Sequence, residues 1–104
     1  MSNAQPKTGS EAIEQRDLGY GGFANVARTK RAILDALNEG QSQNELDDVE
    51  RTALEEIAGK LARIVNGRPK ADNYVDISGY AELVLQHSPR IAATVAPPPK
   101  RGGR

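Results

Sequence analysis

The sequence predicts a small all-α protein, a bundle of three to four helices that is oligomeric and has disordered termini. Apolar residues recur with a helical period over three long segments, sustained strand-like alternation is missing, and Gly- or Pro-containing turns separate the segments. The 104 residues suffice for one domain. We expect a mobile arm at 1–16, a helical domain at 17–88 and a Pro/Gly/basic tail at 89–104.

The first helix is expected over 23–38. Its apolar residues fall on one broad stripe, as in a helix that buries one side, and Gly40 ends it. The stripe consists of Phe23, Val26, Ala27, Ile33, Leu34 and Leu37.

The second helix is expected over 45–66. Asn44 is a suitable N-cap, Asp47 lies in the first turn where the helix dipole favours a carboxylate, and Gly67 is a natural C′ residue. The apolar positions that keep the helical period are Leu46, Val49, Ala53, Leu54, Ile57, Ala58, Leu61, Ile64 and Val65.

The third helix is expected from Asp72, a good N-cap, to about His87. Pro89 stops it because the residue before a proline disfavours the helical conformation. The segment "IAATV" at 91–95 is the candidate for one final turn.

The apolar residues of these helices are small. The chain has one Phe and no Trp, and alanines occupy many of the periodic positions. A core of this size supplies only about 3–5 kcal/mol of stability. We therefore expect a homo-oligomer, most simply a dimer, that buries the remaining apolar surface; the alternative is a marginally stable monomer.

Composition excludes several functions. The formal net charge is zero, so we expect no nucleic-acid partner, and no apolar run reaches the length of a membrane span. With no signal-peptide pattern at the N-terminus, we expect a cytoplasmic protein without a membrane partner. Because cysteine is absent and His87 is the single histidine, a metal would be a hard ion held by oxygens, such as Mg²⁺.

The segment "YGGF" before the first helix is a candidate ligand site. Gly21 and Gly22 allow a ligand to approach the backbone, and the helix start offers unpaired N–H groups to a phosphate. Tyr20 or Phe23 could stack on a base, and Arg28 lies on the first turns of the helix. The alternative is a hydrophobic staple with no ligand.

A second constellation lies on the second and third helices. Lys60 and Arg63 share one side of their helix, and Asp72, Asp76 and Tyr80 follow one another at four-residue intervals. These groups either form an interhelical clamp, with Asp76 paired to Lys60 or Arg63, or line a polar floor that binds a ligand. In the second case the basic residues hold phosphate, or a metal is held by Glu55, Glu56, Asp72 and Asp76.

Three motifs carry a resemblance to a known group of proteins. "YGGF", "KLARIVNG" and "DNYVDISGY" resemble the tyrosine-glycine-x-phenylalanine entry, the K-x-A/S-R-I-x-N-G helix end and the D-x-x-x-D-I-x-G-Y helix of small phage and prophage proteins. The resemblance covers about residues 16–86 and implies an all-helical phage protein of unsettled function.

The same motifs are distantly similar to MazG-type nucleotide pyrophosphohydrolases, which hold Mg²⁺ with E-x-x-E and E-x-x-D pairs. This chain departs from that pattern. Thr52 and Ala53 stand three residues before the two glutamates, Asn73 stands three before Asp76, and Gly22 occupies a position that is often acidic. Each departure removes a metal oxygen, so a two-metal centre is short of ligands.

The sequence thus favours a phage-type protein that binds a nucleotide-like ligand without hydrolysis and without a cofactor, as an anti-defence sponge for a host immune signal. The expected ligand-binding residues are Tyr20, Gly21, Gly22, Phe23, Arg28, Lys60, Arg63, Asp76 and Tyr80. One alternative is a Mg²⁺-dependent, MazG-like pyrophosphohydrolase that uses the four carboxylates. The other is a structural or protein-interaction helical module.

Overall fold

The computed structural model of the protein describes residues 22–95. This part of the chain contains four α-helices, one turn of 3-10 helix and no strand, so the all-α prediction is confirmed for it. In chain order the elements are α2 (Phe23–Leu37), η1 (Gln43–Glu45), α3 (Asp48–Val65), α4 (Ala71–His87) and α5 (Pro89–Ala92). The expected N-terminal arm and the end of the expected C-terminal tail lie outside the described residues.

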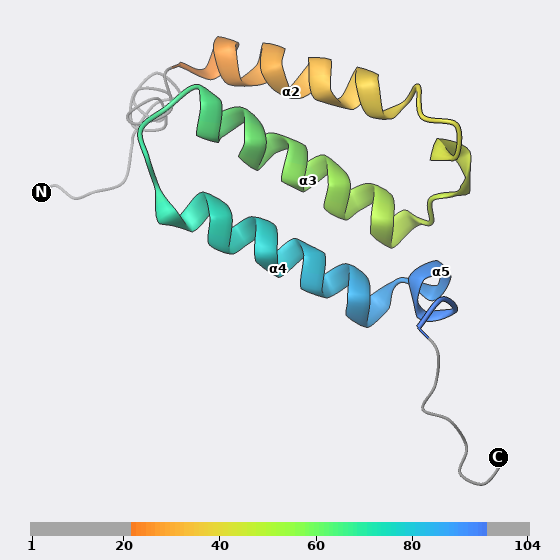
Figure 1. The fold of residues 1–104 in the computed structure, drawn as a ribbon. Coiled ribbons are helices and arrows are strands. Elements are labelled where there is room, and N and C mark those ends of the chain that lie inside the picture. Colours follow the sequence, from red (N-terminus) through yellow and green to blue (C-terminus); the bar gives the residue numbers. More distant parts are fainter. Residues whose placement is uncertain (1–21, 96–104) are drawn as a thin grey trace, which may run out of the picture.

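The three long helices lie side by side in a layer, with α3 in the middle (Figure 1). Packing contacts join α2 to α3 and α3 to α4, and α5 packs against the end of α4. Because α2 and α4 each pack mainly on α3, on opposite flanks, the layer is one helix thick (Figure 1). The starts of α2 and α4 and the end of α3 lie at one end of this layer (Figure 1).

Helix α2 begins where the sequence predicts. Gly22 precedes it with a φ of 105°, a conformation that glycine adopts far more readily than other residues. At its other end, the N–H of Asn38 donates to the carbonyl of Leu34 and closes the last turn.

Helix α3 begins three residues later than predicted, because Asp47 and not Asn44 is its N-cap. The Asp47 carboxylate accepts from the N–H of Glu50 at 2.8 Å, and the Glu50 carboxylate accepts from the N–H of Asp47 at 3.1 Å. This capping box pairs two N–H groups that the helix itself leaves unpaired. Asn44 instead lies within η1.

Helix α3 ends at Val65, close to the predicted position, but the residue that caps this end is not the predicted one. Among the described glycines only Gly22 has a positive φ, so Gly67 does not form the expected left-handed C′ residue. Asn66 takes over part of that role, because its side-chain amide donates to the carbonyl of Ala62 at 2.9 Å. A side chain thus satisfies a carbonyl left open at the helix end.

The N-cap of helix α4 lies two residues earlier than predicted. Lys70, in extended conformation, is its N-cap, and Asp72 lies inside the first turn, where the dipole favours its charge without a capping bond. The helix ends at His87, as expected. Residues 89–92, which we assigned to the tail, form α5, because Ser88 accepts from the N–H of Ile91 and caps this short helix.

The fully buried hydrophobic core of the described chain is small. It consists of Val26, Ala53, Ala58 and Ala62. The large apolar side chains that remain exposed are Phe23, Leu37, Leu61, Val65, Tyr74, Val75, Leu83, Leu85 and Val95. The alanines let the helices approach closely, while the large apolar side chains other than Val26 are half-buried or exposed. Over residues 22–95, no helix has the length and apolarity needed to cross a membrane.

Candidate functional site

Lys60 and Asp76 form an ion pair between α3 and α4. The Lys60 Nζ lies 2.8 Å from the Asp76 Oδ2, with the two side chains 19% and 44% exposed. This is the interhelical clamp that the four-residue spacing on the third helix allowed. The pair neutralises the ammonium group that we expected to hold phosphate.

Arg63 lies away from this ion pair, beside α2. A Cβ placed on Gly59 would lie 3.6 Å from the Arg63 Nη1 and 3.6 Å from the Lys30 Nζ. The side chains of Arg63 and of Lys30, from α2, therefore lie over the same glycine of α3. Lys60 reaches α4 instead, so the predicted phosphate-binding pair is split between the two neighbouring helices.

The opening segment is only partly described, since Tyr20 and Gly21 lie outside residues 22–95. Phe23 is 72% exposed, which leaves its ring on the surface at the start of α2. Arg28 is also exposed and donates to the Asn25 Oδ1 at 2.9 Å. Gly22, the N-cap of α2, has no side chain with which to cap the helix.

The four carboxylates of the metal hypothesis do not converge. Glu55, Glu56 and Asp72 are exposed, and Asp76 is paired with Lys60. In residues 22–95, no three acidic or histidine side chains lie close enough together to hold a metal ion. The donor set therefore does not fit the Mg²⁺ centre that the distant similarity implies.

Tyr80 is half-buried between α3 and α4. It lines a groove of about 400 Å³. The other residues along this groove are Asp48, Val49, Thr52, Ala53, Leu83 and His87. Tyr80 therefore lies next to the Asp48 end of α3, whereas Phe23 lies at the opposite end of the layer (Figure 1).

An open pocket of about 340 Å³ lies at the turn between α3 and α4. Its lining residues are Ile64, Gly67, Pro69, Lys70, Ala71 and Tyr74. Lys70 is the N-cap of α4, and no side chain of the described residues caps this helix start. Tyr74 is 62% exposed. A cation, a helix N-terminus and an aromatic ring thus meet around one pocket.

Sequence reasoning missed Lys70 and Tyr74 as site residues. Both residues lie in or just after the turn "NGRPK" at 66–70. The available signal was Pro69, which disfavours the helical conformation for the residue before it and so marks the turn, with Lys70 directly before the first residue of α4.

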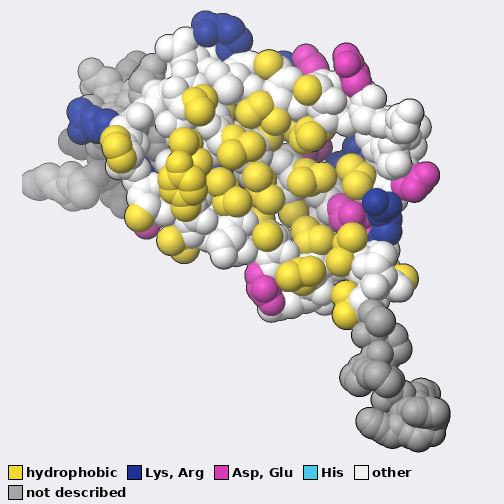
Figure 2. All heavy atoms as spheres, in the orientation of Figure 1, with side chains coloured by type: hydrophobic (Ala, Val, Ile, Leu, Met, Phe, Trp, Pro, Cys, Tyr) yellow, Lys and Arg dark blue, Asp and Glu magenta, His cyan; other side chains and the backbone are white. Residues whose placement is uncertain are grey.

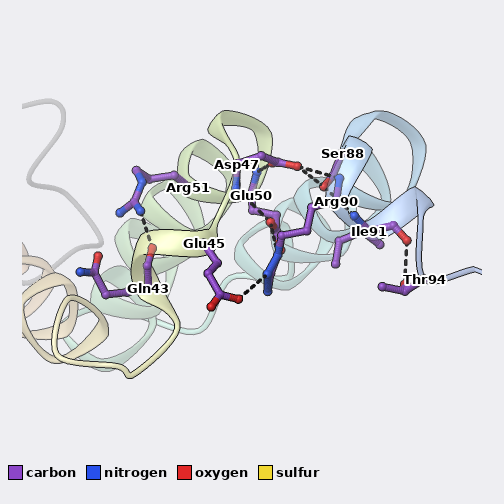
Figure 3. Close-up of polar contacts among 9 residues, drawn as sticks. All are labelled: Gln43, Glu45, Asp47, Glu50, Arg51, Ser88, Arg90, Ile91 and Thr94. Carbon is purple, nitrogen blue, oxygen red and sulfur yellow. Dashed lines mark hydrogen bonds and ion pairs between the residues drawn. The ribbon is translucent and has the colours of Figure 1, made fainter.

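A second polar cluster, also missed, joins the start of α3 to α5 (Figure 3). The Ser88 hydroxyl donates to the Asp47 Oδ2 at 2.5 Å, and the N–H of Arg90 donates to the same oxygen at 3.1 Å. The Arg90 Nε donates to the Glu50 Oε1 at 3.1 Å. Ser88 and Glu50 are buried, at 1% and 7% exposure.

The hydrogen bond from Ser88, followed by that from the Glu50 backbone, lowers the pKa of Asp47 below its ordinary value of 3.8. The cluster thus favours the charged carboxylate. Its groups satisfy one another, and every buried side-chain nitrogen or oxygen of the described residues has a hydrogen-bond partner. We interpret the cluster as a structural joint between α3 and α5.

Comparison with known protein families, with curated protein sequences and with solved structures finds no match to this chain. The similarity to small phage proteins therefore rests on the three sequence motifs, and the candidate site rests on its own geometry.

Proposed function

We propose that the protein binds a phosphate-bearing, nucleotide-like ligand without hydrolysing it, at the pocket between α3 and α4. The observation that carries the proposal is the meeting of Lys70, the uncapped start of α4 and the exposed ring of Tyr74 around one opening, within the described chain. In the phage context that the motifs suggest, such binding would sequester a host nucleotide signal.

Each group has a distinct role in this proposal. The N–H groups and the positive dipole end of α4 attract a phosphate, and the Lys70 ammonium adds a full charge. Tyr74 offers a face on which a base can stack. The Asp72 carboxylate in the first turn repels an anion, so we place the phosphate on the Lys70 side of the helix start.

This placement differs from the one expected from sequence. Lys60 already pairs with Asp76, and Arg63 lies over Gly59 beside α2. A phosphate at Lys60 would have to compete with a carboxylate at 2.8 Å. At the start of α4 an anion instead meets the first turn of a helix whose N-cap residue, Lys70, makes no capping hydrogen bond with its side chain.

The hydrolase alternative has less support, because Glu55, Glu56, Asp72 and Asp76 do not gather around one point. The alternative of a protein-interaction module is favoured by one observation, the Lys60–Asp76 ion pair. In that case the motif residues serve to join helices, and no nucleotide stabilises the protein.

A thermal-shift screen tests the proposal. The purified chain is mixed with nucleotides, cyclic oligonucleotides and ADP-ribose derivatives, each with and without Mg²⁺. A ligand at about 100 times its Kd adds roughly 2.7 kcal/mol to the free energy of unfolding, which raises the Tm visibly. A shift without Mg²⁺ and with intact ligand recovered supports binding alone. A Tm shift that requires Mg²⁺ and yields hydrolysis products supports the hydrolase. If no compound changes the Tm, the result supports the interaction module.

Two variants locate the site once a ligand is found. Lys70→Ala removes a charged phosphate contact worth about 1.5 kcal/mol or more, so the Kd should rise at least tenfold. Lys60→Met should lower the Tm slightly but leave the Kd unchanged. Arg31→Ala, an exposed cation on α2, is the matched control. A Kd that rises with Lys60→Met and not with Lys70→Ala would return the site to α3.

A further inference from the structure

The middle helix α3 has a polar side and an apolar side. Residues two apart on a helix point about 200° from one another, so Leu61 lies opposite both Gly59 and Arg63. Gly59 is covered by the Lys30 and Arg63 side chains, whereas Leu61 remains 40% exposed. Val65, one turn beyond Leu61, is 70% exposed. The side of α3 that carries Leu61 is therefore uncovered and apolar.

Helix α4 shows the same division. Leu83 lines the groove with Thr52, and Thr52 lies two turns before Gly59 on the polar side of α3. Leu85 is two residues beyond Leu83, so it points to the other side of the layer, the side of Leu61. Tyr74 lies three turns before Leu85 on the same stripe. We call the side that carries Leu61, Val65, Tyr74 and Leu85 the apolar face.

Figure 2 shows hydrophobic side chains gathered across the three long helices, with most charged groups toward the margins. They form a broad patch where the helices lie side by side, and the patch extends over α2 as well as α3 and α4 (Figures 1 and 2). A contiguous patch of this extent on a small protein marks an interaction surface.

A cover on this face would stabilise the fold. The buried hydrophobic residues of the described chain are one valine and three alanines, whose burial contributes little compared with the roughly 1.5–3 kcal/mol of a fully buried Leu, Ile or Phe, and the other large apolar side chains are half-buried or exposed. Ordering the backbone opposes folding by about 1–2 kcal/mol per residue. A cover that is present whenever the chain is folded offsets more of this cost than an occasional partner does.

We propose that a second copy of this chain covers the apolar face, so that two three-helix layers pack face to face around a two-fold axis. Helices of 15 to 18 residues are about 22–27 Å long, and three of them side by side are about 25–30 Å wide. The face thus measures about 700 Å², close to the roughly 800 Å² per partner of a stable interface. With a net charge of zero, two copies do not repel one another.

The dimer and the ligand proposal share one residue, because Tyr74 lines the ligand pocket and also lies on the apolar face, but they are tested at different residues. The pocket at Lys70 lies at the end of the layer, beside the edge of the apolar face, whereas Leu61 lies four residues before the end of α3, farther inside that face. A dimer without a ligand, or a ligand-binding monomer, would each leave one proposal standing and remove the other.

The molar mass of the full chain in solution is the first test. We expect twice 11.2 kDa by light scattering, and a dimer Kd that rises about 30-fold or more with Leu61→Arg. Leu83→Arg is the matched control, because Leu83 is 45% exposed but faces the groove on the other side, and its dimer Kd should stay within about threefold of wild type. A folded wild-type monomer, or equal effects of both variants, overturns the proposal.

Labelling a single cysteine keeps the test decisive if Leu61→Arg does not fold. The chain contains no cysteine, so Leu61→Cys and Leu83→Cys each carry one thiol. In the native dimer a maleimide should label Cys at 83 at least about tenfold faster than Cys at 61. Equal labelling rates at the two positions would contradict a second copy. Protection of the cysteine at 61 in a protein with the mass of a monomer would also contradict it, and would identify residues 1–21 as the cover.

Discussion

At the residue scale, the Asp47 side chain connects two helices through three hydrogen bonds. It caps α3 through the N–H of Glu50, and it accepts from both the Ser88 hydroxyl and the N–H of Arg90 (Figure 3). One carboxylate thus fixes the start of α3 and holds α5 against it. The first of these contacts is local, since Asp47 and Glu50 have capping-box spacing, whereas the second joins residues 41 positions apart.

The lowered pKa of Asp47 predicts a loss of stability in acid. Its folded-state pKa lies below the unfolded value, so the charged carboxylate stabilises the fold fully above about pH 4. That contribution is lost as the pH falls through the folded-state pKa. We expect denaturant unfolding between pH 2.5 and 6 to show a shallower acid slope for Asp47→Asn than for wild type, and Asp48→Asn, a change at its exposed neighbour, is measured for comparison. An unchanged slope in Asp47→Asn would show that the charge is not stabilising.

At the element scale, the ends of the helices depend on side chains as well as on glycines. Asn66 closes α3 where a left-handed Gly67 was expected, and it also donates to the Thr29 hydroxyl of α2 at 2.9 Å. The same amide therefore ends one helix and joins it to its neighbour. A sequence window around 66 contains the helix-end residue but not its partner 37 positions away.

Two glycines have open surroundings, Gly22 at the N-cap of α2 and Gly79 within α4. Substitution by alanine should change the stability in opposite directions at these two positions. No described atom lies within 4 Å of a Cβ added to Gly79, in the middle of α4, so Gly79→Ala should raise the free energy of unfolding by about 0.5–1 kcal/mol. Gly22 also has space for a Cβ, but its φ of 105° is strained for alanine, so Gly22→Ala should destabilise. Urea unfolding of both variants measures the difference, and a stabilising Gly22→Ala would mean that the start of α2 is not held at this φ.

At the scale of the whole molecule, the one-helix-thick layer is the feature from which the other conclusions follow. Packing α2 and α4 on opposite flanks of α3 buries small residues at the contacts and leaves large ones on a face. The sequence predicts an oligomer from the scarcity of large apolar groups. The layer adds which side a second copy would cover.

If the fold depends on that second copy, its thermal stability must depend on concentration. Unfolding of a dimer releases two chains, so a hundredfold dilution favours the unfolded state by about 2.7 kcal/mol per dimer. For a chain of this size we expect the Tm to fall by about 5 °C between 100 and 1 µM protein. Calorimetry or circular dichroism at the two concentrations measures the shift. A Tm that is independent of concentration would mean that the layer is stable as a monomer.

The sequence by itself determined the elements of this protein. Apolar periodicity located α2, α3 and α4, and the local signals at Gly22 and before Pro89 ended or began helices at nearly the right residues. It placed the start of α3 three residues too early, because Asn44 and Asp47 are both good caps and only the reciprocal bond with Glu50 distinguishes them. These are local properties, decided by contacts within one helical turn.

Only the tertiary structure decided which chemical groups meet. Lys60, Arg63 and Asp76 looked like one constellation in the sequence, but Lys60 pairs with Asp76 on α4 while Arg63 lies beside Lys30 of α2. The carboxylates of the metal hypothesis separate, and a pocket forms at Lys70 and Tyr74 instead. The physical reason is that helical spacing fixes the side on which a residue lies along its own helix, whereas its neighbours depend on how the helices pack, which in this chain is set by the alanines along α3.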